Sequence, residues 1–532
     1  MGTAAFVTDS SNNEYDEVPY ESYPYSYTHP DKLATIARLF GLKPAPVTKC
    51  RVLELGCASG GNLIPMAIQF PESEFIGIDL SVKQIEDGKE MIAAFGLKNI
   101  TLKHMDIKNV INEEPGRFDY IISHGIYSWV PDHVKDAMFE ICKQKLTQEG
   151  VAYISYNVLP GWHIRGMVRE MMLYHAGQLS DPNKRAEQSR ALMEFINSSV
   201  QYTNVYASIL KHELDFIRVQ KDSYLLHDYL EEINTPVYFY QFVQRASNHG
   251  LQFLGEADFA VMLASNFGPG ISETLNRLSN DVIKTEQYMD FLRNRAFRMT
   301  LLCRSNIQLN RNVQSHLVRQ FRVSGLVKPV NEKMNFQSPQ NESFALPNGL
   351  FINTADPRAK ATLQCIYEAW PQSLSFEELY AAAAARVSSV SVKSPSAVEQ
   401  EKESLSADIL NIYSMGHFKL STFKADFVTT VSDFPKVSKL ALYQANKGIP
   451  VTNQLHEMLT PDVTGNALIK LCDGSNSRSQ ILEKFIQIVK SGELKLERQI
   501  PPEATDEQLH NELQPYVENV LQTLGKYALL VE

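Results

Sequence analysis

The sequence predicts an α/β protein: a doubly wound, mostly parallel, seven-stranded sheet with a helical insertion, followed by mostly helical C-terminal modules. Short apolar runs alternate with segments of helical periodicity from residue 51 onward, which is typical of parallel strands covered by helices on both faces. A turn of small residues follows the first apolar run. The 532 residues, of which 44% are hydrophobic, are enough for two to four domains.

The predicted sheet elements follow one another in the order β-α-β-α-β-β-α-β. We expect strands at 51–55, 74–78, 100–104, 118–123 and 151–156, and helices at 63–69, 82–95 and 132–146. The periodicity over 165–230 predicts almost unbroken helix, too long for one crossover, and therefore a helical insertion at about 165–235. The last two strands are predicted at 251–254 and 297–303, after helices near 238–248 and 284–294.

Composition and a weak repeat predict the remaining organisation. Residues 363–380 and 468–485 each have the pattern helix, polar turn, helix, and each is followed by another helix and a short strand, which suggests two winged-helix-like modules. Ser375 and Glu378 form a capping box in the first repeat. The predicted divisions are a tyrosine-rich cap segment with a short helix (1–45), a ligand-binding domain (46–305), a linker or hairpin region (306–355) and the two modules (356–430 and 431–532).

Charge and cysteine content exclude several classes of protein. The net charge of −10 argues against a nucleic-acid partner, which would need a basic face. The six cysteines are far apart and lie mostly in apolar stretches, so we expect buried thiols rather than disulfides or a metal site. No run of 18 apolar residues and no signal-peptide pattern occurs, so we expect a cytoplasmic protein without membrane insertion; a homodimer is left open.

The turn at residues 54–62 (ELGCASGGN) is the strongest functional signal. Small residues at 56, 58 and 60 allow a sharp turn from strand to helix and a close approach of a ligand to the backbone. Asp79 ends the second strand, 23 residues beyond Gly56, where a carboxylate can bind both ribose hydroxyls of an adenosyl ligand. This context favours ligand binding over an ordinary tight loop.

The turn resembles motif I (E-x-G-x-x-x-G) of the class I, Rossmann-like methyltransferases, which bind S-adenosylmethionine (SAM). SAM has no pyrophosphate, so the third glycine of the dinucleotide pattern is not required. The resemblance implies that Glu54 and Gly56 border the methionine end of SAM, that Leu80 flanks the adenine, and that 118–124 (FDYIISH) forms the floor below the methyl group. The resemblance also implies that Asp106, after the third strand, lies near the adenine amino group; a helix cap is the alternative role for Asp106, and Asp119 is interpreted as structural. The implied cofactor-binding residues are Glu54, Gly56, Cys57, Ala58, Gly60, Asn62, Asp79, Leu80, Asp106, Ile107, Ser123 and His124.

Four further segments carry a narrower resemblance: 20–30 (YESYPYSYTHP), 155–162 (SYNVLPGW), 227–230 (HDYL) and 294–303 (NRAFRMTLLC). They resemble bacterial proteins in which a methyltransferase is joined to a methyltransferase regulatory domain, including the rickettsial lysine methyltransferases of outer-membrane proteins. The resemblance implies a protein substrate, such as a surface or outer-membrane protein before its export, and methylation of lysine amines.

Methyl transfer requires alignment of nucleophile, methyl carbon and sulfur and exclusion of water, rather than strong acid or base groups. A lysine amine must also be neutral, and aromatic side chains both desolvate it and attract the methylated cation. His124 is a candidate proton acceptor, with a structural role as the alternative. Core packing is the alternative for each aromatic candidate, all of which we expect at the carboxyl edge of the sheet: Tyr23, Tyr25, Tyr127, Trp129, Tyr156 and Trp162.

Two other functions are compatible with parts of the sequence. A small-molecule O- or N-methyltransferase would have the same sheet motifs, although the large C-terminal part favours a macromolecular substrate. A winged-helix regulator that binds nucleic acid is disfavoured by the acidic balance and by the lack of a Lys/Arg cluster on the candidate recognition helices, 376–387 and 478–489.

Overall fold

The computed structural model describes residues 21–532 except 201–203, 332, 388–393 and 495–504, and these residues form two compact units. The first unit holds the described part of Met1–Tyr23 together with Leu42–Leu309. The second holds Pro24–Gly41 and Asn310–Glu532. The predicted N-terminal segment 1–45 therefore contributes to both units, and its residues 1–20 lie outside the described part of the chain.

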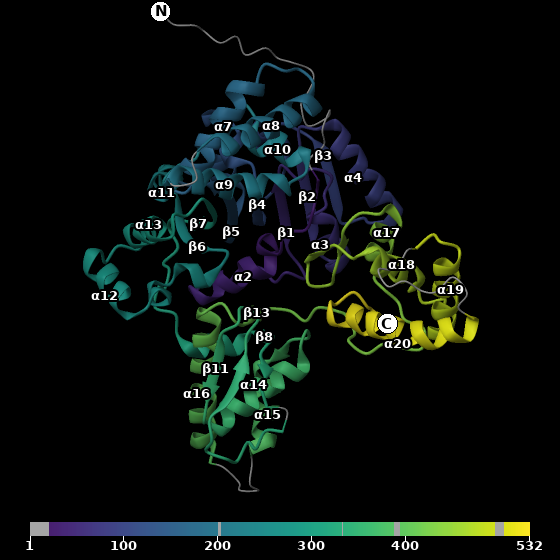
Figure 1. The fold of residues 1–532 in the computed structure, drawn as a ribbon. Coiled ribbons are helices and arrows are strands. Elements are labelled where there is room, and N and C mark those ends of the chain that lie inside the picture. The colour runs from purple at the N-terminus through teal and green to yellow at the C-terminus, as the bar shows by residue number, and fades with distance from the viewer. Residues whose placement is uncertain (1–20, 201–203, 332, 388–393, 495–504) are drawn as a thin grey trace, which may run out of the picture. The chain divides into compact units, whose positions relative to one another are not determined.

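A seven-stranded sheet forms the centre of the first unit, in the order β3-β2-β1-β4-β5-β7-β6 (Figure 1). Strands β1 to β5 pair in parallel, and β7 runs antiparallel to both β5 and β6. The predicted mostly parallel, seven-stranded sheet is therefore confirmed. The strands are β1 Arg51–Leu55, β2 Glu74–Asp79, β3 Ile100–His104, β4 Phe118–Ser123, β5 Leu146–Asn157, β6 Leu251–Glu256 and β7 Phe297–Arg304.

Helix α4, between β2 and β3, begins and ends at residues with clear capping chemistry. In α4 the Ser81 side chain accepts a hydrogen bond from the Gln84 amide, and Gly96 ends the helix with φ +64°. The elements are α3 Leu63–Gln69, α4 Val82–Phe95, η2 Ile107–Asn109, α5 Val110–Glu113, η3 Tyr127–Trp129, α6 Asp132–Lys145, α11 Phe239–Asn248, η4 Phe259–Met262, η5 Ala264–Phe267, α12 Pro269–Leu278 and α13 Val282–Arg293.

The insertion after β5 is helical, as predicted, but its described residues form four helices rather than one nearly unbroken run. The first break lies before Pro182, where the Asp181 side chain accepts hydrogen bonds from the Asn183 and Lys184 amides and starts a new helix. Asn204 caps the next helix in the same way. The four helices are α7 Trp162–Ala176, α8 Pro182–Ser199, α9 Val205–Arg218 and α10 Asp222–Tyr229.

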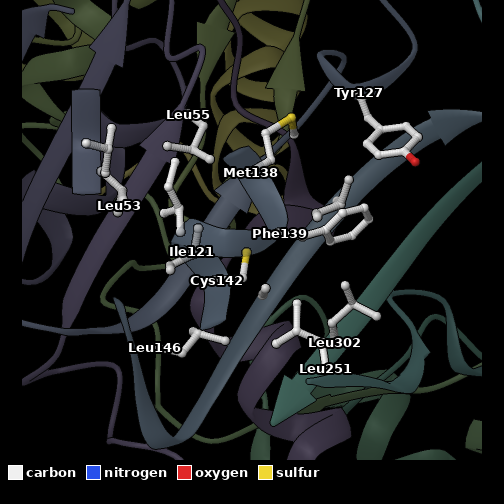
Figure 2. Packing of buried hydrophobic residues seen from close by; sticks show 14 of the residues in the cluster. Leu53, Leu55, Ile121, Tyr127, Met138, Phe139, Cys142, Leu146, Leu251 and Leu302 are labelled. Carbon is white, nitrogen blue, oxygen red and sulfur yellow. The ribbon is translucent and has the colours of Figure 1, made fainter. Parts of the chain in front are cut away.

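A large apolar cluster of the first unit lies between α6 and one face of the sheet. Figure 2 shows Met138, Phe139 and Cys142 of α6 packed over side chains of β1, β4 and the later strands, including Leu53 and Ile121. These side chains are almost fully buried. The cluster therefore fixes the strands whose carboxyl ends carry the predicted site.

The second unit begins with η1 Ser26–Thr28 and α2 Pro30–Leu39. The Asp31 side chain of α2 accepts hydrogen bonds from the amide and the hydroxyl of Thr422, at 2.6 and 2.5 Å. Residues 306–355, predicted as a linker or hairpin region, contain a 3-10 helix and four short strands; β10 and β11 form an antiparallel hairpin. Strands of two to four residues are too short to show a period of two in the sequence.

Both predicted helix, turn, helix repeats are present in the second unit. The Ser375 and Glu378 capping box is also present, with hydrogen bonds of 2.7 and 3.2 Å. The remaining elements are η6 Ser315–Gln320, β8 Arg322–Ser324, β9 Lys328–Pro329, β10 Glu342–Ala345, β11 Phe351–Thr354, α14 Pro357–Ala369, β12 Leu374–Ser375, α15 Phe376–Val387, α16 Pro395–Ser414, β13 Lys419–Ser421, α17 Lys439–Lys447, β14 Val451–Thr452, β15 Met458–Leu459, α18 Val463–Leu471, α19 Arg478–Lys490 and α20 Asp506–Lys526.

All six cysteines are buried thiols, as expected. Among the described residues, no helix combines the length and the apolar character needed to cross a membrane.

Candidate functional site

The glycine turn after β1 adopts a backbone conformation that requires small residues. Gly56 and Gly60 have φ of +75° and +76°, and Ala58 has φ +48°. A Cβ on Gly56 would lie 2.3 Å from the Cδ1 atom of Ile126. Gly56 and Cys57 both donate backbone hydrogen bonds of 2.9 Å to the Ile78 carbonyl, which ties the turn to the end of β2. The positions that the sequence singles out as small are therefore small for a geometric reason.

Asp79 ends β2 beside this turn. Its Oδ2 accepts a 2.8 Å hydrogen bond from the Ala58 amide, and its Oδ1 accepts one of 2.9 Å from the Ser81 amide. Each carboxylate oxygen has a second lone pair, so the same group can accept hydrogen bonds from ligand hydroxyls. Leu80, the next residue, is 55% exposed and can cover an aromatic ring.

Glu54, in β1, is a buried carboxylate that is satisfied on one side alone. Its Oε1 accepts a 2.7 Å hydrogen bond from Asn62, whereas its Oε2 has no partner among the described residues. The pKa of Glu54 is raised to about 8, mainly by burial; the Asn62 hydrogen bond lowers it, and the negative charge of Asp79 adds to the increase. A buried acceptor without a donor is costly, so this site fits a cationic ligand group. The hydroxyl of Ser123, at the end of β4, is also buried, and no described residue forms a hydrogen bond with it.

His124 follows β4 and is held by Tyr153 of β5, whose hydroxyl lies 2.8 Å from Nδ1. Burial lowers the pKa of His124 to about 4, so the imidazole is neutral at pH 7. Such a histidine is a weak base and a good hydrogen-bonding group.

Several predicted residues have structural partners. Asp106 caps η2 by accepting a 2.9 Å hydrogen bond from the Lys108 amide, and Ile107 packs against the core cluster. The Cys57 side chain is buried over Gly77, where an added Cβ would lie 2.7 Å from the sulfur. Asp119 accepts hydrogen bonds from the Arg51 amide and the Thr147 hydroxyl, which agrees with its structural interpretation.

Tyr127 and Tyr156 lie in the core, contrary to the prediction that they line the sheet edge. Both side chains are 1% exposed and belong to the cluster of Figure 2, where Tyr127 lies near Phe139. The Tyr156 ring stacks on Phe242 with centroids 3.9 Å apart, and its hydroxyl is 2.9 Å from Thr300 Oγ1. Core packing, the alternative role given above for each aromatic candidate, therefore describes these two residues.

The structure brings Trp129 and Trp162 together. They follow β4 and β5 respectively, and their rings meet edge to face at 6.2 Å. Tyr23 belongs to the first unit, where its hydroxyl donates to the Glu21 carboxylate, and Tyr25 belongs to the second unit. Trp129 and Trp162 are thus the aromatic pair that the first unit itself supplies after β4 and β5.

Residues 21–23 form a strap across the glycine turn, which sequence reasoning missed. The Gly61 amide donates a 2.8 Å hydrogen bond to Ser22 Oγ, and a Cβ on Gly61 would lie 2.2 Å from the Ser22 carbonyl oxygen. Glu21 forms a 2.5 Å ion pair with Lys221, just before α10. The sequence signal for this strap is Gly61. The turn itself needs a glycine at position 60, so a second adjacent glycine indicates that another part of the chain comes close.

Three families match successive parts of the chain. A methyltransferase domain matches residues 47–215, a predicted methyltransferase regulatory domain matches 221–304, and the PKMT C-terminal winged helix domain matches 433–529. The second winged-helix prediction is therefore supported by a named domain.

Two relatives match almost the whole chain. The uncharacterized protein RP789 of Rickettsia prowazekii (strain Madrid E) is 37% identical over 98% of this chain and 95% of its own length. The structure of PKMT2 from Rickettsia typhi is 32% identical and covers 97% of this chain and 100% of its own, with a TM-score of 0.86. This chain belongs to the PKMT family of methyltransferases. PKMT2 has also been solved in complex with AdoHcy, with the same identity and coverage.

As a member of the PKMT family, the chain is a SAM-dependent methyltransferase with a regulatory domain and a C-terminal winged-helix domain. The family and the cofactor that the sequence predicts are both confirmed.

Proposed function

We propose that this PKMT-family protein transfers the methyl group of SAM to lysine side-chain amines of a protein substrate. The observation that carries the placement of SAM is the unpartnered Glu54 Oε2 beside the left-handed glycine turn. The lysine acceptor is supported by the resemblance to PKMT2 over nearly the whole chain and by the aromatic pair Trp129 and Trp162.

The residues of the turn fit the parts of SAM one by one. Glu54 would bind the ammonium group of the methionine end, and the amides at Gly56, Ala58 and Gly60 would lie against the ligand. Asp79 would accept hydrogen bonds from the ribose hydroxyls. Leu80 and Ile107 would cover the adenine. The Asp106 carboxylate already accepts a hydrogen bond from the Lys108 amide at the start of η2, so it would bind the adenine through its remaining oxygen lone pairs. Asn62 would hold Glu54 in place, and Cys57 would pack behind the turn.

When bound, SAM supplies a methyl group that is already activated by its sulfonium. The protein must therefore orient the acceptor, exclude water and bind the amine in its neutral form. Trp129 and Trp162 would desolvate the amine and stabilise the methylated cation that forms. Ser123 and the neutral His124 would form the floor of the site and make hydrogen bonds there. Tyr23 belongs to the strap of residues 21–23 and would contribute to the site from that position.

We place the reaction in the cytoplasm, on a surface or outer-membrane protein before its export. The modules of the second unit have no role in methyl chemistry, so we assign them the binding of this protein substrate. Tyr25 lies in the N-terminal segment that belongs to the second unit, and we assign it the same role. A homodimer is compatible with this assignment.

Labelling tests the proposal. Purified protein is incubated with methyl-labelled SAM and a bacterial lysate, and labelled protein is hydrolysed to amino acids. We expect label in methylated lysine. Label in small molecules alone would instead support a small-molecule methyltransferase, and label in other amino acids would show a different protein acceptor.

A further inference from the structure

A cluster of charged and aromatic side chains lies among three helices of the insertion, outside the residues assigned to SAM. Arg165 of α7, Glu213 of α9 and Asp228 of α10 are its charged members, and α7 packs against both other helices (Figure 1). The Arg165 guanidinium lies over the rings of Trp162 and Phe216, at 5.6 and 4.7 Å from their centroids.

Two independent contacts connect the helices that carry this cluster to the methyltransferase site. On one side, Trp162 starts α7 directly after β5 and meets Trp129, which follows β4. On the other side, Lys221 precedes α10 and pairs with Glu21 of the strap, which crosses the glycine turn at Gly61. Both routes lead to the carboxyl edge of the parallel strands, where doubly wound sheets bind ligands.

Asp228 is the member of the cluster whose hydrogen-bonding capacity is unused. Arg165 donates to the Tyr224 hydroxyl at 3.4 Å, and Glu213 accepts from the Tyr229 hydroxyl at 3.2 Å. No donor among the described residues lies within hydrogen-bonding distance of the half-buried Asp228 carboxylate, and its interaction with Arg165 is purely electrostatic.

We propose that Asp228 binds the ammonium group of the acceptor lysine and takes its proton before methyl transfer; this inference rests on the proposed lysine specificity. One N–H bond of the ammonium breaks and an O–H bond forms on Asp228, which leaves a neutral amine and a neutral carboxyl group. The amine nitrogen then bonds to the methyl carbon as the carbon–sulfur bond breaks, which gives AdoHcy and a methylated ammonium.

The surroundings of Asp228 suit this role. Burial raises the pKa of Asp228 to about 7, although the positive charge of Arg165 opposes the shift. A proton acceptor with a pKa close to the working pH is the most effective kind of base. The other titratable groups around it are Glu213, Tyr224 and Tyr229.

The test is the pH dependence of lysine methylation by Asp228→Asn. The substrate is the lysate protein that wild type labels on lysine, and the rate is measured under limiting substrate from pH 6 to 10. We expect the methylation rate of the wild-type protein to rise through pH 7 and then level off. Asp228→Asn should be at least about 100-fold slower at pH 7 and should recover toward pH 10, where the free amine forms in solution.

Matched variants separate a proton acceptor from a structural residue. Asp222→Asn, an exposed carboxylate of the same helix that pairs with Arg190, should keep the wild-type profile. The Asp228→Glu variant should keep the inflection of the pH profile near pH 7, with a lower rate of methylation. The affinity for SAM, measured by calorimetry, should be unchanged in all variants. An Asp228→Asn variant with the wild-type pH profile, or one that has lost SAM binding, would overturn the inference. Failure of wild type to label lysine would instead overturn the proposed function, and the inference with it.

Discussion

The Ala58 amide donates a 2.8 Å hydrogen bond to Asp79 Oδ2, across the gap between the glycine turn and the end of β2. Ala58 makes this hydrogen bond in a left-handed conformation, with φ +48°. The residue proposed to bind the ribose therefore also holds the turn that approaches the ligand. In this way the chain itself organises the site.

Glu54→Gln should stabilise the protein without cofactor at high pH and weaken SAM binding. The pKa of Glu54 rises from an ordinary 4.5 to about 8 in the fold, so the folded state keeps a proton that the unfolded chain releases. The free energy of unfolding of wild type therefore falls as the pH rises from about 4.5 to 8. Glutamine removes this loss, which we expect to be about 1–3 kcal/mol.

Denaturant unfolding at pH 6 and pH 9 measures the effect, and calorimetry with SAM should show at least about 10-fold weaker binding for Glu54→Gln. A variant with unchanged SAM affinity would show that Glu54 does not bind the ammonium group.

Gly61→Ala should displace the strap, because its Cβ would lie 2.2 Å from the Ser22 carbonyl oxygen. We expect faster dissociation of AdoHcy, by about 10-fold or more, measured by stopped-flow competition. Gly270→Ala in α12 is the matched control, since its Cβ would meet no atom within 4 Å. Equal dissociation rates for the two variants would mean that the strap does not restrain the ligand.

Arg298→Met should be the most destabilising single change in the first unit. Arg298 is fully buried and pairs with Glu256, Glu286 and Asp290 at 2.8 to 2.9 Å. Removing the cation leaves Glu286 without its ion-pair partner and leaves Glu256 and Asp290 with Arg295 alone, at a cost of about 3–5 kcal/mol. Thermal unfolding measures the loss, and Arg218→Met, whose guanidinium and acidic partners are exposed, should leave the midpoint almost unchanged. Similar midpoints for both variants would contradict this account of the buried network.

Tyr127→Phe should keep methyltransferase activity within about twofold, because the Tyr127 ring lies in the core and the substitution keeps its volume. Trp129→Ala should reduce kcat/KM by about 10-fold or more through loss of the aromatic wall. Steady-state kinetics with the labelled lysine substrate compares the two. A large loss of activity in a Tyr127→Phe variant of normal stability would show that Tyr127 does belong to the site.

The sheet and the glycine turn could be predicted because each leaves a local pattern in the sequence. The apolar run of 51–55, the cap at Ser81 and the glycine at 96 need no distant partner to be interpreted. The Asp181-Pro182 pair is a local signal for the break before Pro182, but the prediction of almost unbroken helix over 165–230 did not use it.

Other features depend on contacts between residues that are distant in sequence. Ser22 and Gly61 are 39 residues apart, and Glu21 and Lys221 are 200 apart, so the strap has no local signature. Tyr127 and Tyr156 posed a different problem. A tyrosine close to a strand end has the same sequence pattern whether its ring turns into the core or toward the sheet edge, and only the packing against Phe242 and Phe139 decides it.

Calorimetry of AdoHcy binding to Asp79→Ala tests the placement of the cofactor most directly. Loss of the charge-assisted hydrogen bonds to the ribose should weaken binding by about 100-fold or more. Asp87→Ala, an exposed position on α4, is the control, and circular dichroism checks that both variants fold. Wild-type affinity in a folded Asp79→Ala variant would show that the adenosyl group does not lie at the glycine turn.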